Sequence, residues 1–289
     1  KSIKRPITSI AGVDVQEELY DIETSYGYGG PITNSTDREF LVKAFDDYKA
    51  HCASHKIVCE FIRLHPFNSI NKHSFLFDMF IHERDVVVVD LTQTQDERRA
   101  QYSKTTRNII RKAEKKLKII ENSPGLTQFI ETYYDTMKKN KADDFYFFSE
   151  DYFHRLNSIN EVDLLEVSLE DQLLSIGFIM RGSELAHYHL SANNYELAKE
   201  NGNYLLLDAA FNLAKSKGSK YMILGGGRTS SPEDSLLKFK KKFSKTTMPF
   251  YIAGIDFIPE KRAMLNSIWI DNNKNQNQEI PKIFQLYRV

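Results

Sequence analysis

Residues 162–192 read VDLLEVSLEDQLLSIGFIMRGSELAHYHLSA. Two polar breaks divide this stretch into three apolar and β-branched runs, which predict consecutive strands over 162–169, 172–181 and 184–192. Helices over 126–141 and 150–157 are expected before the strands, and a helix over 203–217 with a strand over 221–224 after them. A doubly wound fold would need strict alternation of strands and helices, so this order predicts mixed α/β sheets instead.

The first half of the chain repeats this plan in outline. Strands are expected over 7–15, 57–64, 74–80 and 85–91, with a helix over 36–54 capped by Ser35 or Thr36 and a long helix over 95–117. The breaker Asn122-Ser123-Pro124-Gly125 predicts a boundary between an N-terminal domain, residues 1–122, and a C-terminal domain, residues 123–289. The C-terminal part should end in a strand over 250–257, a helix over 259–270 and a loose Asn/Gln-rich tail over 271–278.

Composition excludes several classes of protein. Apolar residues make up 41% of the 289 residues, enough to build a core, and Lys plus Arg equals Asp plus Glu at 39 each. This balance argues against a general nucleic-acid coat, and DNA is not an expected partner.

Cys52 and Cys59 predict two buried or half-buried thiols in a reducing compartment. Without an apolar run of ~20 residues or a signal peptide, the chain is expected to be cytoplasmic.

The stretch LGGGRTSSPEDSLLKFKKKF, residues 224–243, is the most informative for chemistry. Ser231, Pro232 and Asp234 fit the N-cap, N1 and N3 positions of a helix over 232–243. Gly226 and Arg228 lie in a glycine-rich turn that would let a ligand approach the backbone, although a tight turn alone explains the glycines. The turn is neither a Walker A loop nor a GxGxxG motif.

Lys240 is the candidate catalytic residue of this stretch. Leu236, Phe239 and Phe243 form the expected apolar stripe of the helix, and Lys240 lies on the same side as Leu236. An ammonium on an apolar face must find a partner or border a cavity. It could stabilise negative charge on a carbonyl or phosphate oxygen, or it could extend its head into water.

Two further stretches carry candidate residues for binding and for proton transfer. In the strand over 184–192, alternation places His187, His189 and Ser191 on one face, where they could line a polar pocket or form a hydrogen-bonded sheet surface. Without a third ligand in sight, no metal site is predicted. The helix over 95–117 carries a basic stripe that would suit a diphosphate or RNA, or would simply be solvated: Lys104, Arg107, Arg111 and Lys115.

The first half offers a loop with aromatic rings and glycines, residues 25–31, in which Tyr28 and Gly29 could contact a sugar or nucleotide. Arg63 and His65 lie at the end of a predicted strand, just before Pro66. Sites in α/β proteins commonly form at such strand ends.

Taken in order, these stretches resemble the Fem family, whose members attach amino acids to peptidoglycan precursors, and its relatives in the GNAT acyltransferase superfamily. The resemblance runs over most of the chain and is carried by the following residues: Tyr26-Gly27-Tyr28-Gly29-Gly30-Pro31, Arg63-Leu64-His65-Pro66, Arg107 with Ile110-Arg111-Lys112-Ala113, Tyr188-His189-Leu190-Ser191-Ala192, Leu224-Gly225-Gly226-Gly227, and Asp234-Ser235-Leu236 with Phe239-Lys240 and Phe243.

The resemblance implies two tandem GNAT-like domains with an acceptor bound in a cleft between them. It implies that the N-terminal domain serves the acceptor and the C-terminal domain the donor and the chemistry. Lys240 would assist the transfer, and His187 and His189 would line the site. His189 is also a candidate catalytic residue, as the acceptor of the amine proton.

The expected reaction is transfer of an acyl or aminoacyl group to an amine of a cell-envelope saccharide or peptidoglycan precursor, free or lipid-linked. No permanently bound cofactor is expected; the co-substrate would be acyl-CoA or aminoacyl-tRNA. Acyl-CoA is slightly favoured because the sequence has no long antiparallel helical arm of the kind that larger Fem members carry. Without a membrane span, any membrane contact would be peripheral. The alternative is a non-catalytic module of the same fold that binds a nucleotide sugar or RNA.

Overall fold

The computed structural model describes residues 1–273 and 283–289, and it divides the chain into two compact units. Unit 1 comprises Lys1–Arg84 and Pro249–Val289, and unit 2 comprises Asp85–Met248. The divisions fall within two strands, β6 (Met79–Asp90) and β12 (Thr247–Asp256). They differ from the predicted boundary at Asn122–Gly125, because the C-terminal strand pairs with the N-terminal part of the chain and completes its sheet.

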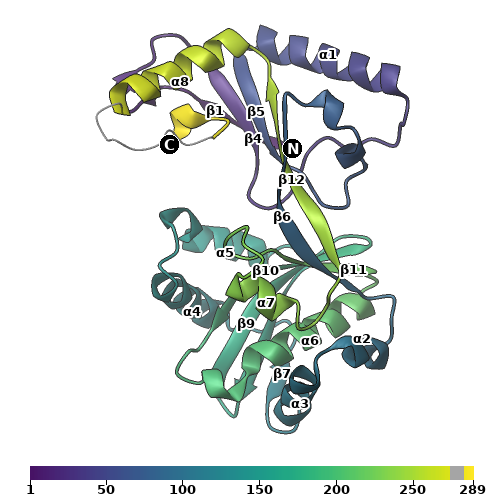
Figure 1. Ribbon diagram of the computed structural model, residues 1–289. Coiled ribbons are helices and arrows are strands. Elements are labelled where there is room, and N and C mark those ends of the chain that lie inside the picture. Colours follow the sequence, from purple (N-terminus) through teal and green to yellow (C-terminus); the bar gives the residue numbers. More distant parts are fainter. Residues whose placement is uncertain (274–282) are drawn as a thin grey trace. The chain divides into compact units, whose positions relative to one another are not determined.

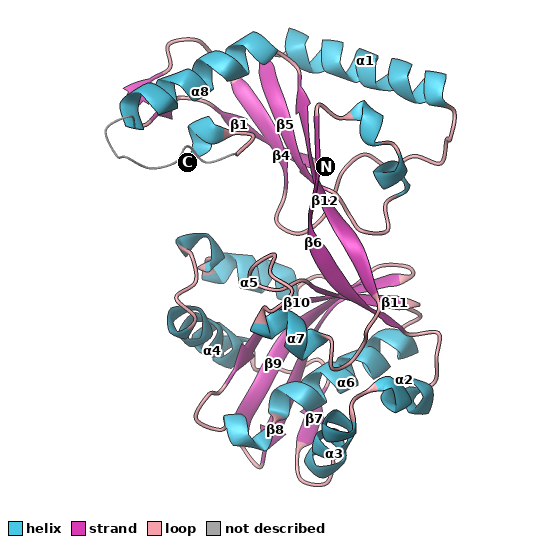
Figure 2. Cartoon of the chain, in the orientation of Figure 1, coloured by secondary structure: helices cyan, strands magenta, loops and turns pink. Residues whose placement is uncertain are grey.

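Unit 1 is a small sheet between two helices (Figure 2). Its strands run in the order β1-β4-β5-β12, where β4 and β5 are parallel and β5 and β12 antiparallel. One face packs on α1 through Leu41 and Phe45, and the other packs on α8 through Leu265. The elements are β1 (Ser2–Pro6), β2 (Ser9–Ile10), β3 (Val13–Asp14), β4 (Tyr20–Thr24), α1 (Arg38–Ser54), β5 (Ile57–Arg63) and α8 (Pro259–Asn273).

Several predicted bounds in unit 1 need correction. Asp37, not Ser35 or Thr36, caps α1, because its carboxylate accepts the amides of Glu39 and Phe40. The strand predicted over 74–80 begins with a 3-10 turn, Ser74–Leu76, and the following β6 merges with the strand predicted over 85–91. Residues 271–273 of the predicted tail belong to α8, while 274–278 lie outside the described residues. Cys52 and Cys59 are buried free thiols, as predicted.

Unit 2 contains the predicted meander. Its strands run in the order β6-β11-β10-β9-β8-β7, with β10 and β11 parallel and the other neighbours antiparallel. The mixed α/β fold is therefore confirmed. The elements are α2 (Gln95–Gln101), α3 (Lys104–Ala113), β7 (Lys118–Ile120), α4 (Leu126–Lys139), α5 (Glu150–Asn157), β8 (Val162–Leu169), β9 (Gln172–Arg181), β10 (Leu185–Asn193), α6 (Gly202–Ser216), β11 (Tyr221–Gly225) and α7 (Ser235–Lys240).

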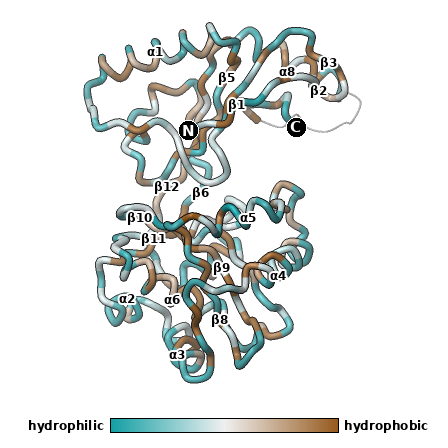
Figure 3. The backbone as a smooth tube through the Cα atoms, turned by 180° about the vertical axis from the view of Figure 1, so that it is seen from behind, coloured by the Kyte–Doolittle hydropathy of each residue, from teal (hydrophilic) through white to brown (hydrophobic). Residues whose placement is uncertain are grey.

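Two apolar clusters cover the faces of the unit 2 sheet. On one face, Leu165 and Val167 of β8 pack with α6 and with Leu237 of α7. On the other, Leu164 packs with α4 and α5 through residues such as Phe129 and Phe153. Figure 1 shows α4 and α5 on one side of these strands and α6 on the other. The strands β8 and β9 contain hydrophobic stretches in Figure 3, as expected for strands covered on both faces.

The helix predicted over 95–117 is broken into α2 and α3. Tyr102 has extended backbone angles and a buried ring, and Ser103 caps α3 by accepting the amide of Thr106. The Arg107 side chain donates to the carbonyl oxygens of Ala100 and Tyr102 and so holds the break together. A helical periodicity that continues across the break concealed it in the sequence.

Candidate functional site

The Lys240 side chain points back toward the glycine-rich turn that follows β11. Its Nζ donates a 2.7 Å hydrogen bond to the carbonyl oxygen of Gly226, and the side chain is half-buried. The helix that carries it spans only Ser235–Lys240, shorter than the predicted 232–243. The residue buried in that helix is Leu237, not Leu236, with Phe243 buried just after it. Lys240 is thus anchored beside the turn.

Asp234 connects the turn to α7. Its carboxylate accepts the amides of Leu236 and Leu237 and is the N-cap, a role predicted for Ser231. The same carboxylate accepts the amides of Arg228 and Thr229 at 3.1 Å. A Cβ at Gly227 would lie 2.5 Å from the Asp234 carboxyl carbon, so only glycine fits there. Because four residues donate to this one carboxylate, the turn has a fixed shape.

Gly226 and Arg228 therefore lie with Lys240, as the sequence suggested. The Arg228 guanidinium donates to the Ser235 hydroxyl at 3.2 Å and is otherwise exposed. A cation at this position is available to meet an anionic group.

The parallel strands β10 and β11 pair over a short distance. The pairs run from Leu185–Tyr221 to His187–Ile223, and residues 188–193 of β10 continue beyond the last pair. From its carboxyl end β10 leads into α6, while β11 leads into the glycine turn. The carboxyl ends of parallel strands in an α/β sheet commonly form ligand sites. The Lys240 turn lies at such an end.

A β-bulge at His189 changes the predicted faces of β10. In the pairing with β9, Tyr188 lies opposite Ile179 and Leu190 opposite Phe178, so His189 is the extra residue. Ala186 and Tyr188 pack on the α6 side, whereas Leu190 packs on the α4 and α5 side. The strict alternation was wrong beyond this point, because a bulge shifts the side-chain direction by one residue. Ser191 consequently leaves the face of His187 and His189 and lies against Gly177 near α6.

His189 has a partner that the sequence did not indicate. The Tyr152 hydroxyl of α5 lies 2.8 Å from His189 Nε2, so a proton can be shared between them. Burial lowers the pKa of His189 to about 4, and burial also raises the pKa of Tyr152. Both groups are therefore neutral at pH 7. No spacing in the sequence joins residues 152 and 189; only the packing of α5 on the sheet does.

The depressed pKa of His189 makes unfolding depend on pH. The unfolded chain binds a proton at His189 below about 6.5, while the folded protein does so only below about 4. Stability from this group is thus complete above pH 6.5 and is lost as pH falls toward 4, by about 3 kcal/mol. We expect the difference in unfolding free energy between the wild type and His189→Gln to shrink by that order between pH 7 and pH 4.5, measured by urea unfolding. An unchanged difference would show that His189 is not buried.

The candidate residues of the first half gather in unit 1. The Gly29 amide donates to the Arg63 carbonyl at 2.8 Å, and the His65 amide donates to the Gly29 carbonyl at 3.1 Å. These bonds fix the loop to the end of β5. A Cβ at Gly30 would lie 2.7 Å from Leu64, which requires glycine at that position.

Aromatic rings surround Tyr28 in the same unit. Its ring meets His65 and Phe250 edge to face, with centroids 5.7 and 5.3 Å away, and burial raises its pKa to about 12. His65 Nδ1 accepts the amide of Phe67, which places the proton of the neutral ring on Nε2. Burial lowers the pKa of His65, so this ring tends to stay neutral. The Arg63 guanidinium is held by the Glu23 carboxylate and the Thr24 carbonyl.

Arg107 and Arg111 do not join these groups. Both lie on α3 in unit 2, although they were expected in the N-terminal domain. Arg107 is used to hold the break between α2 and α3, and Arg111 donates to Asn108 one turn away. They are exposed and belong to the helix surface.

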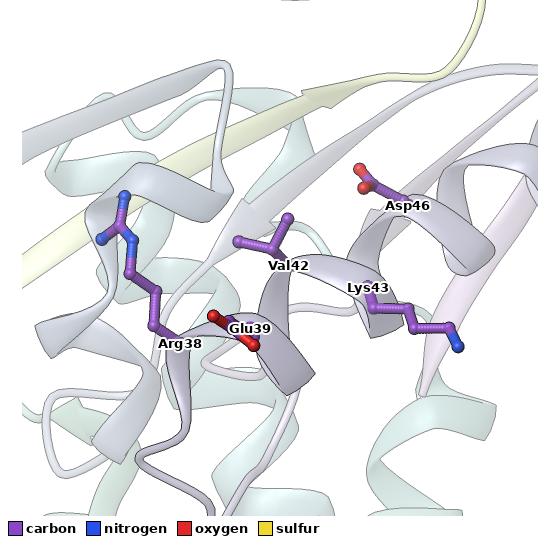
Figure 4. Close-up of a pocket in the computed structure, with 5 residues that line it drawn as sticks. All are labelled: Arg38, Glu39, Val42, Lys43 and Asp46. Carbon is purple, nitrogen blue, oxygen red and sulfur yellow. The ribbon is translucent and has the colours of Figure 1, made fainter.

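A surface hollow on α1 is not associated with the candidate residues. It has a volume of about 420 Å³ and is lined by Arg38, Glu39, Val42, Lys43 and Asp46 (Figure 4). All five residues come from one exposed helix, and no candidate nucleophile or base is among them.

Within residues 1–273 and 283–289 no group of three or more metal-ligating side chains is found. Over the same residues, no helix combines the length and the apolar character of a membrane span.

Comparisons with known proteins bear on the fold that carries these residues. Residues 97–240 match the family described as an acetyltransferase (GNAT) domain. The structure of FemX has a TM-score of 0.68 at 14% identity, covering 91% of this chain and 90% of that one. L-PGS from Bacillus licheniformis has a TM-score of 0.61 at 15% identity, covering 92% and 88%. No curated protein sequence gave a significant match.

At these identities the structures establish the fold, and the family match covers the part of the chain that contains His189, Gly226 and Lys240. The mixed α/β fold and the GNAT-like resemblance expected from the sequence are confirmed. Residues 97–240 match a GNAT acetyltransferase domain, and the fold of the chain is similar to that of FemX.

Proposed function

We propose that the protein transfers an acyl or aminoacyl group from an activated donor to an amine of a cell-envelope saccharide or peptidoglycan precursor. The observation that carries this proposal is the Lys240 ammonium, fixed on the Gly226 carbonyl in a domain of the GNAT family. The acceptor class comes from the resemblance to Fem proteins.

The chemistry needs a group that stabilises an oxyanion. The amine nitrogen attacks the carbonyl carbon of a thioester or ester, a C–N bond forms, and the carbonyl oxygen becomes negative. The C–S or C–O bond then breaks, and the amine proton leaves to a base. Lys240, already oriented by Gly226, would stabilise the oxyanion without reorganising at the moment of reaction.

We propose that the donor lies in unit 2, at the carboxyl ends of β10 and β11. The amino end of α6 follows β10, and its first turn has no acidic residue, which suits a phosphate group. Acyl-CoA remains the favoured donor over aminoacyl-tRNA, and Arg228 is a candidate contact for donor phosphates. His187, on the paired stretch of β10, and Ser191, on the opposite face of that strand, would flank this end.

The acceptor would bind in unit 1. Tyr28 and His65 present aromatic surface beside the Gly29 loop, and a sugar ring can stack on such a surface. Arg63, with its charge balanced by Glu23, would shape the loop and leave recognition to neighbouring groups.

Titration calorimetry with acetyl-CoA and, separately, with charged tRNA tests the donor. We expect saturable binding of one donor, followed by its transfer to glucosamine or to a muramyl-peptide nucleotide, detected by mass spectrometry. Binding of neither donor would remove the donor assignment. Binding without transfer to any amine would support the non-catalytic alternative, which the comparisons do not favour.

A further inference from the structure

The position of Tyr152, next to the bulge of β10, is fixed by contacts with its neighbours. It lies in the first turns of α5, which begins at the Ser149 N-cap, and its ring stacks on Phe148 with centroids 4.6 Å apart. Phe148 is fixed in turn, because the Tyr134 hydroxyl donates to its carbonyl oxygen at 2.7 Å. The Tyr152 hydroxyl is thereby held 2.8 Å from His189 Nε2.

The chemistry of the two groups favours one direction for this hydrogen bond. An imidazole nitrogen is a far stronger base than a phenol oxygen, and a phenol is a far stronger acid than a neutral imidazole N–H. A proton relay from Tyr152 to His189 requires the Nδ1–H tautomer of His189, in which the Tyr152 O–H donates to Nε2. A neutral imidazole has one acceptor nitrogen, and in this tautomer that nitrogen faces Tyr152.

We propose that Tyr152 is the group that takes the proton from the attacking amine and passes its own proton to His189. In the Nδ1–H tautomer the Tyr152 hydroxyl engages the Nε2 lone pair of His189 at 2.8 Å, so a proton would reach His189 through Tyr152. The inference rests on the proposed transferase function and adds a residue to it.

The relay conserves atoms and charge. The N–H bond of the acceptor amine breaks and an O–H bond forms on Tyr152 as the original Tyr152 O–H bond breaks and an Nε2–H bond forms on His189. His189 becomes an imidazolium ion and returns its proton by the reverse route, to the leaving thiolate or alkoxide or to water. No other reactant is needed.

The resting hydrogen bond can be measured without any substrate. Long-range ¹H–¹⁵N correlation spectra of the full chain should show His189 as the Nδ1–H tautomer at pH 7. Tyr152→Phe should shift the Nε2 resonance, while the matched variant Tyr133→Phe, whose hydroxyl donates to the Tyr146 carbonyl in the same aromatic cluster, should leave it in place. An Nε2–H tautomer in the wild type would overturn the relay.

Kinetics then test the role. With acetyl-CoA or aminoacyl-tRNA as donor, Tyr152→Phe and His189→Ala should each lower kcat roughly 10²-fold, in the range for proton-transfer groups. The double variant should be no slower than either single variant, because one relay is removed only once. Tyr133→Phe should keep wild-type turnover.

Two outcomes distinguish failure of the relay from failure of the proposed function. If the wild type transfers and Tyr152→Phe matches its kcat while keeping its fold, the relay is wrong and the proposed function stands. If the wild type transfers with neither donor, the proposed function and the relay fall together.

Discussion

Replacing Lys240 with alanine should lower kcat by about 10²–10³-fold, the loss seen when one oxyanion donor is removed. The ammonium donates a 2.7 Å hydrogen bond to the Gly226 carbonyl and the side chain is half-buried, so losing this bond should cost the fold about 1 kcal/mol. Donor affinity should change little, because the interaction is made in the transition state. Steady-state kinetics and calorimetric donor binding measure the two effects separately.

Lys238→Ala is the matched control for this variant. Lys238 lies on the same short helix, but its ammonium pairs with the exposed Glu233 carboxylate. Turnover of Lys238→Ala should equal that of the wild type. Near wild-type turnover in Lys240→Ala would remove Lys240 from the mechanism, whatever the control shows.

Asp208→Ala should destabilise unit 2 by about 3 kcal/mol, or roughly 10 °C in Tm. The Asp208 side chain is 1% exposed in the middle of α6, where it accepts from the Arg99 guanidinium and from the Tyr102 hydroxyl at 3.0 Å. Its removal leaves Arg99 partly buried with only Glu114 as a carboxylate partner. Calorimetric or circular-dichroism melting measures the loss.

The comparison for Asp208 is an exposed ion pair. Asp151 pairs with Arg155 one turn away on α5, with both side chains more than two-thirds exposed. Asp151→Ala should cost less than about 0.5 kcal/mol. Asp208→Asn keeps the volume and should fall between these values. Equal Tm for Asp208→Ala and the wild type would show that the network does not hold α2 against α6.

Local features were readable from the sequence. The meander over 162–192, the glycine turn and the Lys240 helix all follow from short-range patterns, and Lys240 and Gly226 lie within one strand-turn-helix segment. Most errors at this range were shifts of bounds and caps, such as Asp234 for Ser231, and one was the missed break at Tyr102 in the helix predicted over 95–117. The cap errors arose because several residues near a helix start can accept the first amides, and only the backbone angles select one.

Strand register and pairing between distant segments could not be predicted from the sequence. His189 is the extra residue of a bulge because of where β9 pairs with β10, and this pairing moves Ser191 to the other face. The hydrogen bond between Tyr152 and His189 likewise depends on how α5 packs on the sheet. The boundary between the units depends on β12 pairing with β5, whose residues are distant in the sequence.

The amino-acid sequence by itself determined the order of elements, the mixed sheet, and the Lys240 cation beside a glycine turn, because these depend on periodicity and on neighbours along the chain. The tertiary structure alone decided which strands complete each unit and which side chain meets His189. Such contacts join residues far apart in the chain, and their geometry is set by the packing of whole elements rather than by any local pattern.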